Sequence, residues 1–175
     1  MRIFLIGLMG TGKSTIGRRL ASATGWPYFD NDRLIEAATG RAAPELMRDE
    51  GEAGLHAAEM AAFEHALTLP QPVIISGAGY VVTDAGARQR MRASDVVVWL
   101  RADAATLAER ARHADGRRDE ATSLAWIERT AAERDPLFHE IATLIVDTDK
   151  QSPKAIVDAI VAWPAVAAEL ARRVT

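Results

Sequence analysis

The segment Gly7–Thr15, with the sequence GLMGTGKST, constrains this chain more than any other feature. It contains the pattern G-x-x-x-x-G-K-S and directly follows an apolar run that is typical of a buried strand. Glycine lets the backbone turn so that its N–H groups face phosphate oxygens, and the following helix adds the positive end of its dipole. A glycine-rich turn that merely contains a lysine is the alternative. The strand–loop–helix context favours a nucleoside triphosphate site.

Six residues of this segment form the predicted nucleotide site. Lys13 supplies a positive charge to the β- and γ-phosphates, and the hydroxyl of Ser14 is a ligand for Mg²⁺. Backbone N–H groups of the remaining residues face the phosphate oxygens. The set is Gly10, Thr11, Gly12, Lys13, Ser14 and Thr15. ATP and Mg²⁺ are therefore the expected cofactors.

A magnesium site at this loop also needs a carboxylate from a neighbouring strand. Asp30 and Asp147 each follow a predicted strand, and Asp30 is the better candidate because the last strand is expected to lie far from the phosphates. We expect Asp30 to serve the metal through water, and Asp32 to orient or deprotonate the acceptor hydroxyl. The alternative is that Asp32 only caps a helix beginning at Arg33.

Short apolar runs alternate with helical stretches along the whole chain. Most runs are rich in Ile and Val, as in parallel strands that helices cover on both faces. This alternation predicts an α/β fold, a three-layer sandwich with a five-stranded parallel sheet. The expected strands are Ile3–Leu8, Tyr28–Asp30, Val73–Ser76, Val96–Leu100 and Leu144–Asp147. The expected helices include Lys13–Ala23, Arg33–Thr39, Ala43–Glu50, Leu55–Leu67, Asp84–Arg92, Ala104–Arg112 and Leu124–Glu133, with a helix starting at Pro153 that Pro164 breaks.

Composition narrows the class of protein further. The 175 residues suit one domain spanning 1–175, and 21 Lys and Arg against 24 Asp and Glu leave no basic surface for nucleic acid. The absence of Cys excludes a disulfide scaffold, a thiolate zinc site and a Cys nucleophile. No apolar run approaches the roughly 18 residues of a membrane span. We expect a monomeric cytoplasmic protein without nucleic-acid or membrane partners.

The segment His113–Ser123 is polar, charged and free of large apolar side chains. Because it has little to bury, we expect it to form a loop or lid of residues 113–123 over the site. Two arginines, Arg117 and Arg118, lie within it.

Taken together, these segments resemble the shikimate kinases, small kinases of the nucleoside-monophosphate-kinase type, over nearly the whole chain. No short piece apart from the phosphate loop is decisive, but the order and spacing of the pieces are specific. The matching pieces are residues 7–21, Asp30-Asn31-Asp32 with Ile35-Glu36, Thr39-Gly40-Arg41, Gly51-Glu52, Glu59, Gly77-Ala78-Gly79, Arg134-Asp135-Pro136-Leu137-Phe138, and Val146-Asp147-Thr148 with Pro153.

The resemblance implies roles for several residues. Arg117, or its neighbour Arg118, would reach the transferring phosphoryl group from the lid, and Arg110 would lie over the adenine face. Arg134 would bind the carboxylate of a small hydroxylated acceptor. Helices in the region 31–67 would hold that acceptor. The implied acceptor site consists of Asp32, His56, Gly77, Ala78, Gly79 and Arg134.

Three segments depart from the family pattern. His56 stands where the family has an Arg that clamps the carboxylate, so a permanently charged fork becomes an imidazole. Ala78 replaces the middle glycine of G-G-G, and Asp119-Glu120 adds acidity to the lid.

Three functional hypotheses therefore remain open. They are phosphorylation of shikimate, phosphorylation of a different and less acidic small alcohol, and nucleotide binding by a regulatory protein without turnover. The charge lost at His56 weighs against shikimate, whereas the intact pair Asp30 and Asp32 weighs against the regulatory protein.

Overall fold

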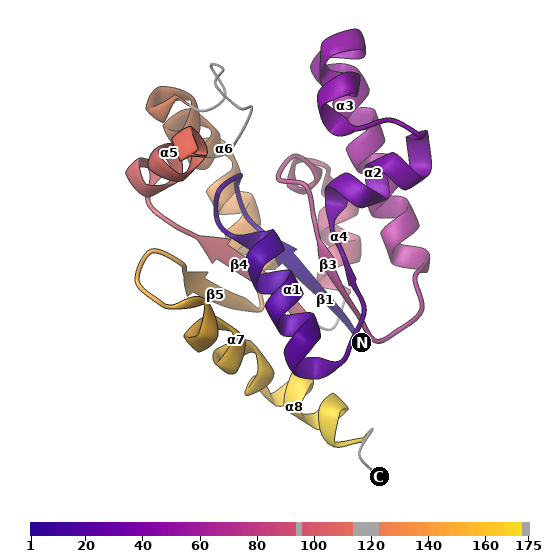
Figure 1. Ribbon diagram of the computed structural model, residues 1–175, viewed down its shortest axis with the longest axis vertical. Coiled ribbons are helices and arrows are strands. Elements are labelled where there is room, and N and C mark those ends of the chain that lie inside the picture. The colour runs from indigo at the N-terminus through magenta and orange to yellow at the C-terminus, as the bar shows by residue number, and fades with distance from the viewer. Residues whose placement is uncertain (94–95, 114–122, 173–175) are drawn as a thin grey trace.

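The computed structural model describes residues 1–93, 96–113 and 123–172. It has the predicted α/β architecture, with five parallel strands in the order β2-β3-β1-β4-β5 (Figure 1). The strands are β1 (Arg2–Ile6), β2 (Tyr28–Phe29), β3 (Val73–Ser76), β4 (Val96–Arg101) and β5 (Leu144–Asp147). All five expected strands are thus present, with ends that differ by two residues or fewer.

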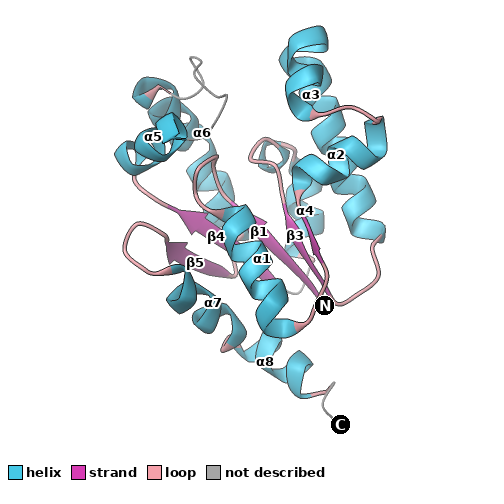
Figure 2. Ribbon diagram, in the orientation of Figure 1, coloured by secondary structure: helices cyan, strands magenta, loops and turns pink. Residues whose placement is uncertain are grey.

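Helices cover both faces of this sheet, as Figure 2 shows with the helices in cyan and the strands in magenta. They are α1 (Lys13–Thr24), α2 (Asn31–Thr39), α3 (Ala43–Thr68), α4 (Ala85–Arg92), α5 (Ala104–His113), α6 (Leu124–Ile141), α7 (Pro153–Val161) and α8 (Pro164–Ala171), with a short 3₁₀ turn, η1 (Val81–Thr83). None of the helices in the described part of the chain has the length and apolarity that crossing a bilayer requires.

Alternation along the strands produces two apolar clusters, one on each face of the sheet. In β1, Ile3 and Leu5 pack with α1, α7 and α8, whereas Phe4 and Ile6 pack with α3, α4, α5 and α6. The four side chains are at most 3% exposed. Burial on both faces explains why the strands read as continuous apolar runs.

Three helices differ from their predicted bounds by more than one residue. α2 begins at Asn31 instead of Arg33, because Asp30 is its N-cap. The two predicted helices, Ala43–Glu50 and Leu55–Leu67, are separated by a break as expected, at Gly51 with φ 70°, but the second helix follows this kink directly, so that both belong to one element, α3. α6 runs past Glu133 and through Pro136 to Ile141. This extension buries Phe138 and Ile141 in the core. The free energy gained by their burial offsets the loss of the helical hydrogen bond that Pro136 cannot donate.

The carboxyl ends of the parallel strands bring the predicted site residues to one edge of the sheet. The phosphate loop follows β1, Asp30 follows β2, and Gly77–Gly79 follows β3. In Figure 1, α2 and α3 project beyond the sheet next to this edge. The fold therefore gathers segments that are far apart in sequence around the loop between β1 and α1.

Candidate active site

The phosphate loop passes very close to the end of β4. A Cβ atom on Gly7 would lie 2.1 Å from the carbonyl oxygen of Leu100, and φ at Gly7 is 136°, so only glycine fits there. Lys13 folds across the loop, where Nζ donates to the carbonyl oxygens of Gly7 at 2.8 Å and Leu8 at 2.9 Å. The ammonium group is thus held against the loop that the sequence assigns to phosphate.

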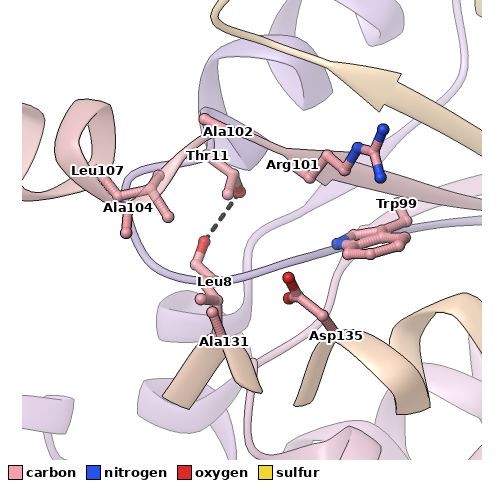
Figure 3. Close-up of a pocket in the computed structure, with 9 residues that line it drawn as sticks. All are labelled: Leu8, Thr11, Trp99, Arg101, Ala102, Ala104, Leu107, Ala131 and Asp135. Atoms are coloured by element: carbon pink, nitrogen blue, oxygen red, sulfur yellow. Dashed lines mark hydrogen bonds between the residues drawn. The ribbon is translucent and has the colours of Figure 1, made fainter. Parts of the chain in front are cut away.

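Thr11 supports the loop from inside. Its side chain is 1% exposed, and its Oγ1 donates to the carbonyl oxygen of Leu8 at 2.8 Å. Figure 3 shows that Thr11 and Leu8, which this bond joins, line a small pocket between the phosphate loop, the end of β4, α5 and α6. Among the described residues predicted for the site, Thr11 alone lines this pocket. The Thr11 side chain therefore shapes the loop instead of facing a ligand.

Asp30 sits beside the loop with both carboxylate oxygens engaged. Oδ2 accepts from the Tyr28 hydroxyl at 2.6 Å, and Oδ1 accepts from the Asp32 N–H at 3.2 Å. Burial acts to raise the pKa of Asp30, but hydrogen bonds from Tyr28 and Ser14 and the charge of Lys13 bring that pKa below its usual value. Asp30 is therefore an ionised carboxylate, and it lies close enough to the Ser14 hydroxyl for that hydroxyl to act on its pKa.

The donors at this point suit Mg²⁺, which prefers hard oxygen ligands and usually takes one or two carboxylates together with substrate phosphates. Asp30 and Ser14 would hold it. The other candidate, Asp147, accepts a hydrogen bond from Arg101, which lowers the pKa of Asp147. No group of three His, Asp or Glu side chains in the described ranges could hold a metal by itself.

Asp32 lies in the first turn of α2 and is exposed. The alternative that Asp32 caps this helix is wrong, because Asp30 occupies the N-cap position. Asp32 is close enough to Glu59 of α3 for their charges to interact, and Lys13 also acts on Glu59. Asp32 therefore belongs to the same cluster of charges as the phosphate loop.

Arg134 of α6 lies next to Gly79, close to the start of the phosphate loop. A Cβ on Gly79 would lie 3.6 Å from Arg134 Nη1 and 3.5 Å from the carbonyl oxygen of Gly7. Arg134 Nε is buried and has no hydrogen-bond partner among the described residues. A half-buried guanidinium beside a glycine is suited to bind an anionic group of a ligand.

Glu59 faces this arginine, and the sequence analysis did not place it in the site. Burial raises the pKa of Glu59 to about 7, against the opposing charge of Arg134. Its Oε2 is buried without a hydrogen-bond partner in the described part of the chain. The family-like spacing of Glu59 from His56 was the available signal.

His56 stacks on Tyr80, a second residue that the sequence analysis missed. The two ring centroids are 3.4 Å apart, with 2° between the planes, and Cζ of Arg134 lies 5.9 Å from the Tyr80 centroid. Burial and then the charge of Arg134 lower the pKa of His56, although Glu52 acts in the opposite direction. The imidazole is therefore neutral near pH 7.

The remaining predicted residues occupy defined places. The Gly77 N–H donates to the carbonyl oxygen of Leu5 at 3.0 Å, which continues the β3–β1 pairing. Ala78 packs against the apolar core. Arg110 donates to the Gly10 carbonyl at 3.1 Å and to Oγ1 and the carbonyl oxygen of Thr148, so it joins the phosphate loop to the loop after β5. Arg117 and most of the predicted lid lie outside the described residues.

A loop of the G-x-x-x-x-G-K-S type between the first strand and the first helix of a parallel sheet is typical of the P-loop proteins, which bind nucleoside triphosphates. The shikimate kinase family model matches residues 9–164, and the chain belongs to this family. Among similar proteins are shikimate kinases of Thiobacillus denitrificans (38% identical over 152 residues, 86% of this chain and 82% of that protein) and Halorhodospira halophila (38% over 162 residues, 91% of each).

A solved structure shows the same fold. The shikimate kinase from Acinetobacter baumannii in complex with shikimate matches with a TM-score of 0.80 and 27% identity, over 91% of this chain and 90% of that one. The predicted family and fold class are thus confirmed, and the chain is an enzyme of the kinase class.

Proposed function

We propose that this protein transfers the γ-phosphoryl group of Mg·ATP to a hydroxyl group of shikimate. The observation that carries the proposal is the Arg134 guanidinium, half-buried beside Gly79 and the phosphate loop with an unpartnered Nε. It offers one cationic site for the carboxylate of a small acid. The names of the relatives support the choice of acid.

The phosphate loop binds the nucleotide. Lys13 exchanges its bonds to the Gly7 and Leu8 carbonyls for bonds to phosphate oxygens, and Ser14 with Asp30 holds the metal. Mg²⁺ supplies positive charge to the β- and γ-phosphate oxygens. Arg110 holds the phosphate loop and the loop after β5 together, next to the place proposed for the nucleotide base.

Other residues bind and activate the acceptor. Arg134 binds the carboxylate, and Asp32 accepts the hydroxyl proton as the acceptor oxygen bonds to the γ-phosphorus and the bond to ADP breaks. Neutral His56 offers a hydrogen bond in place of a second permanent charge. Arg117 of the predicted lid would stabilise charge on the transferring group.

A coupled assay of ADP release tests this function with shikimate, other hydroxylated acids, neutral polyols and nucleosides as acceptors. We expect turnover that depends on both shikimate and Mg²⁺. The neutral stack of His56 on Tyr80 favours one competing function, phosphorylation of an uncharged alcohol. Faster turnover of a polyol would favour that competitor, and ATP binding without turnover of any acceptor would favour a regulatory protein.

A further inference from the structure

Tyr28 lies in β2 with its ring against α1. A Cβ on Gly17 would be 2.2 Å from Cε2 of Tyr28, so only glycine at position 17 lets the ring take this place. The hydroxyl then reaches the edge of the sheet, 2.6 Å from Asp30 Oδ2 and 2.7 Å from Ser76 Oγ. The position of the ring therefore places the Tyr28 hydroxyl within hydrogen-bond distance of Asp30, the proposed metal ligand.

The direction of these two hydrogen bonds follows from the number of protons. A tyrosine hydroxyl has one hydrogen, and an ionised carboxylate can only accept. Tyr28 therefore donates to Asp30 and accepts from the hydroxyl of Ser76, which is 2% exposed. The result is a chain of two hydrogen bonds, in which Ser76 of β3 donates to Tyr28 and Tyr28 donates to Asp30.

The sheet register explains how β3 comes to take part. Tyr28 pairs with Ile74 and Phe29 with Ile75, so the next step brings Asp30 beside Ser76. β3 ends at Ser76 and supplies no carboxylate residue. Ser76 therefore acts on Asp30 only through its hydrogen bond with the Tyr28 hydroxyl.

We infer that Tyr28 is a positioning residue, which orients the Asp30 carboxylate toward the metal that Asp30 and Ser14 hold. The bond to Tyr28 fixes Oδ2 while the Asp32 N–H fixes Oδ1, so the carboxylate cannot rotate freely. This inference rests on the proposed function, because that function assigns the metal to Asp30. Groups that orient a metal ligand commonly contribute tenfold or more to metal affinity.

The test is Tyr28→Phe, which keeps the ring against Gly17 and removes only the hydroxyl. Binding of Mn²⁺ to the enzyme–ADP complex, followed by electron paramagnetic resonance, should weaken about tenfold. The Mg²⁺ concentration that gives half-maximal turnover should rise by a similar factor. KM for shikimate should stay within about twofold, because the acceptor side does not contact Tyr28.

Two further variants separate this role from general stability. Thr24→Val removes the hydroxyl that donates to the Leu20 carbonyl at the far end of α1, and it should leave Mn²⁺ binding unchanged. Ser76→Ala should weaken Mn²⁺ binding by about two- to threefold, and adding it to Tyr28→Phe should cause no further loss, since Ser76 acts through Tyr28.

Mn²⁺ binding by Tyr28→Phe at wild-type strength would overturn the inference, even if the variant melts at a lower temperature. Full additivity of Ser76→Ala and Tyr28→Phe would overturn the serial arrangement. Asp30→Asn separates the assignment of the metal to Asp30 from the positioning role of Tyr28. Unchanged Mn²⁺ binding in Asp30→Asn would refute the metal assignment itself, whereas a loss in Asp30→Asn without a loss in Tyr28→Phe would refute only the role of Tyr28.

Discussion

Glu59 is a carboxyl group that the fold holds largely out of water, close to Arg134 and to the negative charge of Asp32. Its two possible charge states differ in what they do to the acceptor site. When Glu59 is neutral, Arg134 is available to an acceptor carboxylate. When Glu59 is ionised, it competes for the same guanidinium. We therefore expect the protonation state of Glu59 to couple pH to binding of the acceptor proposed for Arg134.

Stability should reveal the pKa of Glu59, which burial raises from 4.5 to about 7. At Glu59 the folded state then binds more protons than the unfolded state, so the contribution of Glu59 to stability is fully present below pH 4.5 and is lost as pH rises through 7. Relative to Glu59→Gln, the wild type should lose about 2–3 kcal/mol in unfolding free energy between pH 5 and 8. Urea unfolding at both pH values measures this difference.

Glu128→Gln, an exposed substitution on α6, is the control and should follow the wild type at both pH values. A constant difference between wild type and Glu59→Gln across this range would show that Glu59 does not titrate there.

Lys13 is the second residue whose role is testable alone. Because its ammonium group is the permanent charge held on the phosphate loop, Lys13→Ala should lower kcat/KM for ATP by about 10²-fold or more. Calorimetric titration with Mg·ATP should show a parallel loss of affinity. Lys154→Ala, which removes an exposed lysine paired with Asp158, should change neither quantity. Unchanged affinity in Lys13→Ala would contradict the nucleotide site.

At the scale of elements, the proposed acceptor site combines residues of several elements, and no single helix provides all of them. α3 carries His56 and Glu59 on one side, α6 carries Arg134, and the segment after β3 carries Gly79 and Tyr80. The Tyr80 ring contacts both helices, through the stack on His56 and the guanidinium of Arg134. The spacing of α3 and α6 therefore sets the size of the acceptor site.

Adding charge to α3 tests this assembly. His56→Arg should lower KM for shikimate about tenfold, because a second guanidinium can pair with the carboxylate, and KM for ATP should not change. Steady-state kinetics with shikimate and with a neutral polyol measures the effect. His65→Arg adds the same charge at an exposed position of the same helix and should have no effect. A raised KM for shikimate in His56→Arg would show that the stack on Tyr80 is the better arrangement.

The whole molecule is held by two apolar clusters that share the sheet between them. Phe138 of α6 is fully buried, and its ring centroid is 5.8 Å from that of Trp99 in β4. The same helix carries Arg134 one turn earlier. Packing of α6 on the sheet thus fixes both the core and the position of the acceptor-binding cation.

Phe138→Ala should therefore reduce the unfolding free energy by about 3–5 kcal/mol, because it leaves a cavity beneath α6. Chemical unfolding measures this loss. Met47→Ala, at a position 42% exposed, should change stability by less than about 0.5 kcal/mol. Comparable effects of the two substitutions would argue against the packing described for α6.

Sequence reasoning worked where the signal is local. The phosphate loop, the helix start at Pro153 and the break at Pro164 all depend on neighbouring residues, and the structure has each of them. It failed at the end of α6, which was predicted at Glu133, whereas the helix continues through Pro136, a residue that favours helix termination, to Ile141. Burial of Phe138, four residues beyond Arg134, outweighs that local signal.

The sequence by itself determined the class of this protein, because the spacing of Gly7–Thr15 dictates a loop with inward-facing N–H groups wherever it occurs. Only the tertiary structure decided the partners of the site residues. Ser76 meets Tyr28 across 48 positions of sequence, and the pKa of Glu59 follows from burial against Arg134. Such pairings depend on strand order and helix packing, and the distance along the chain carries no information about either.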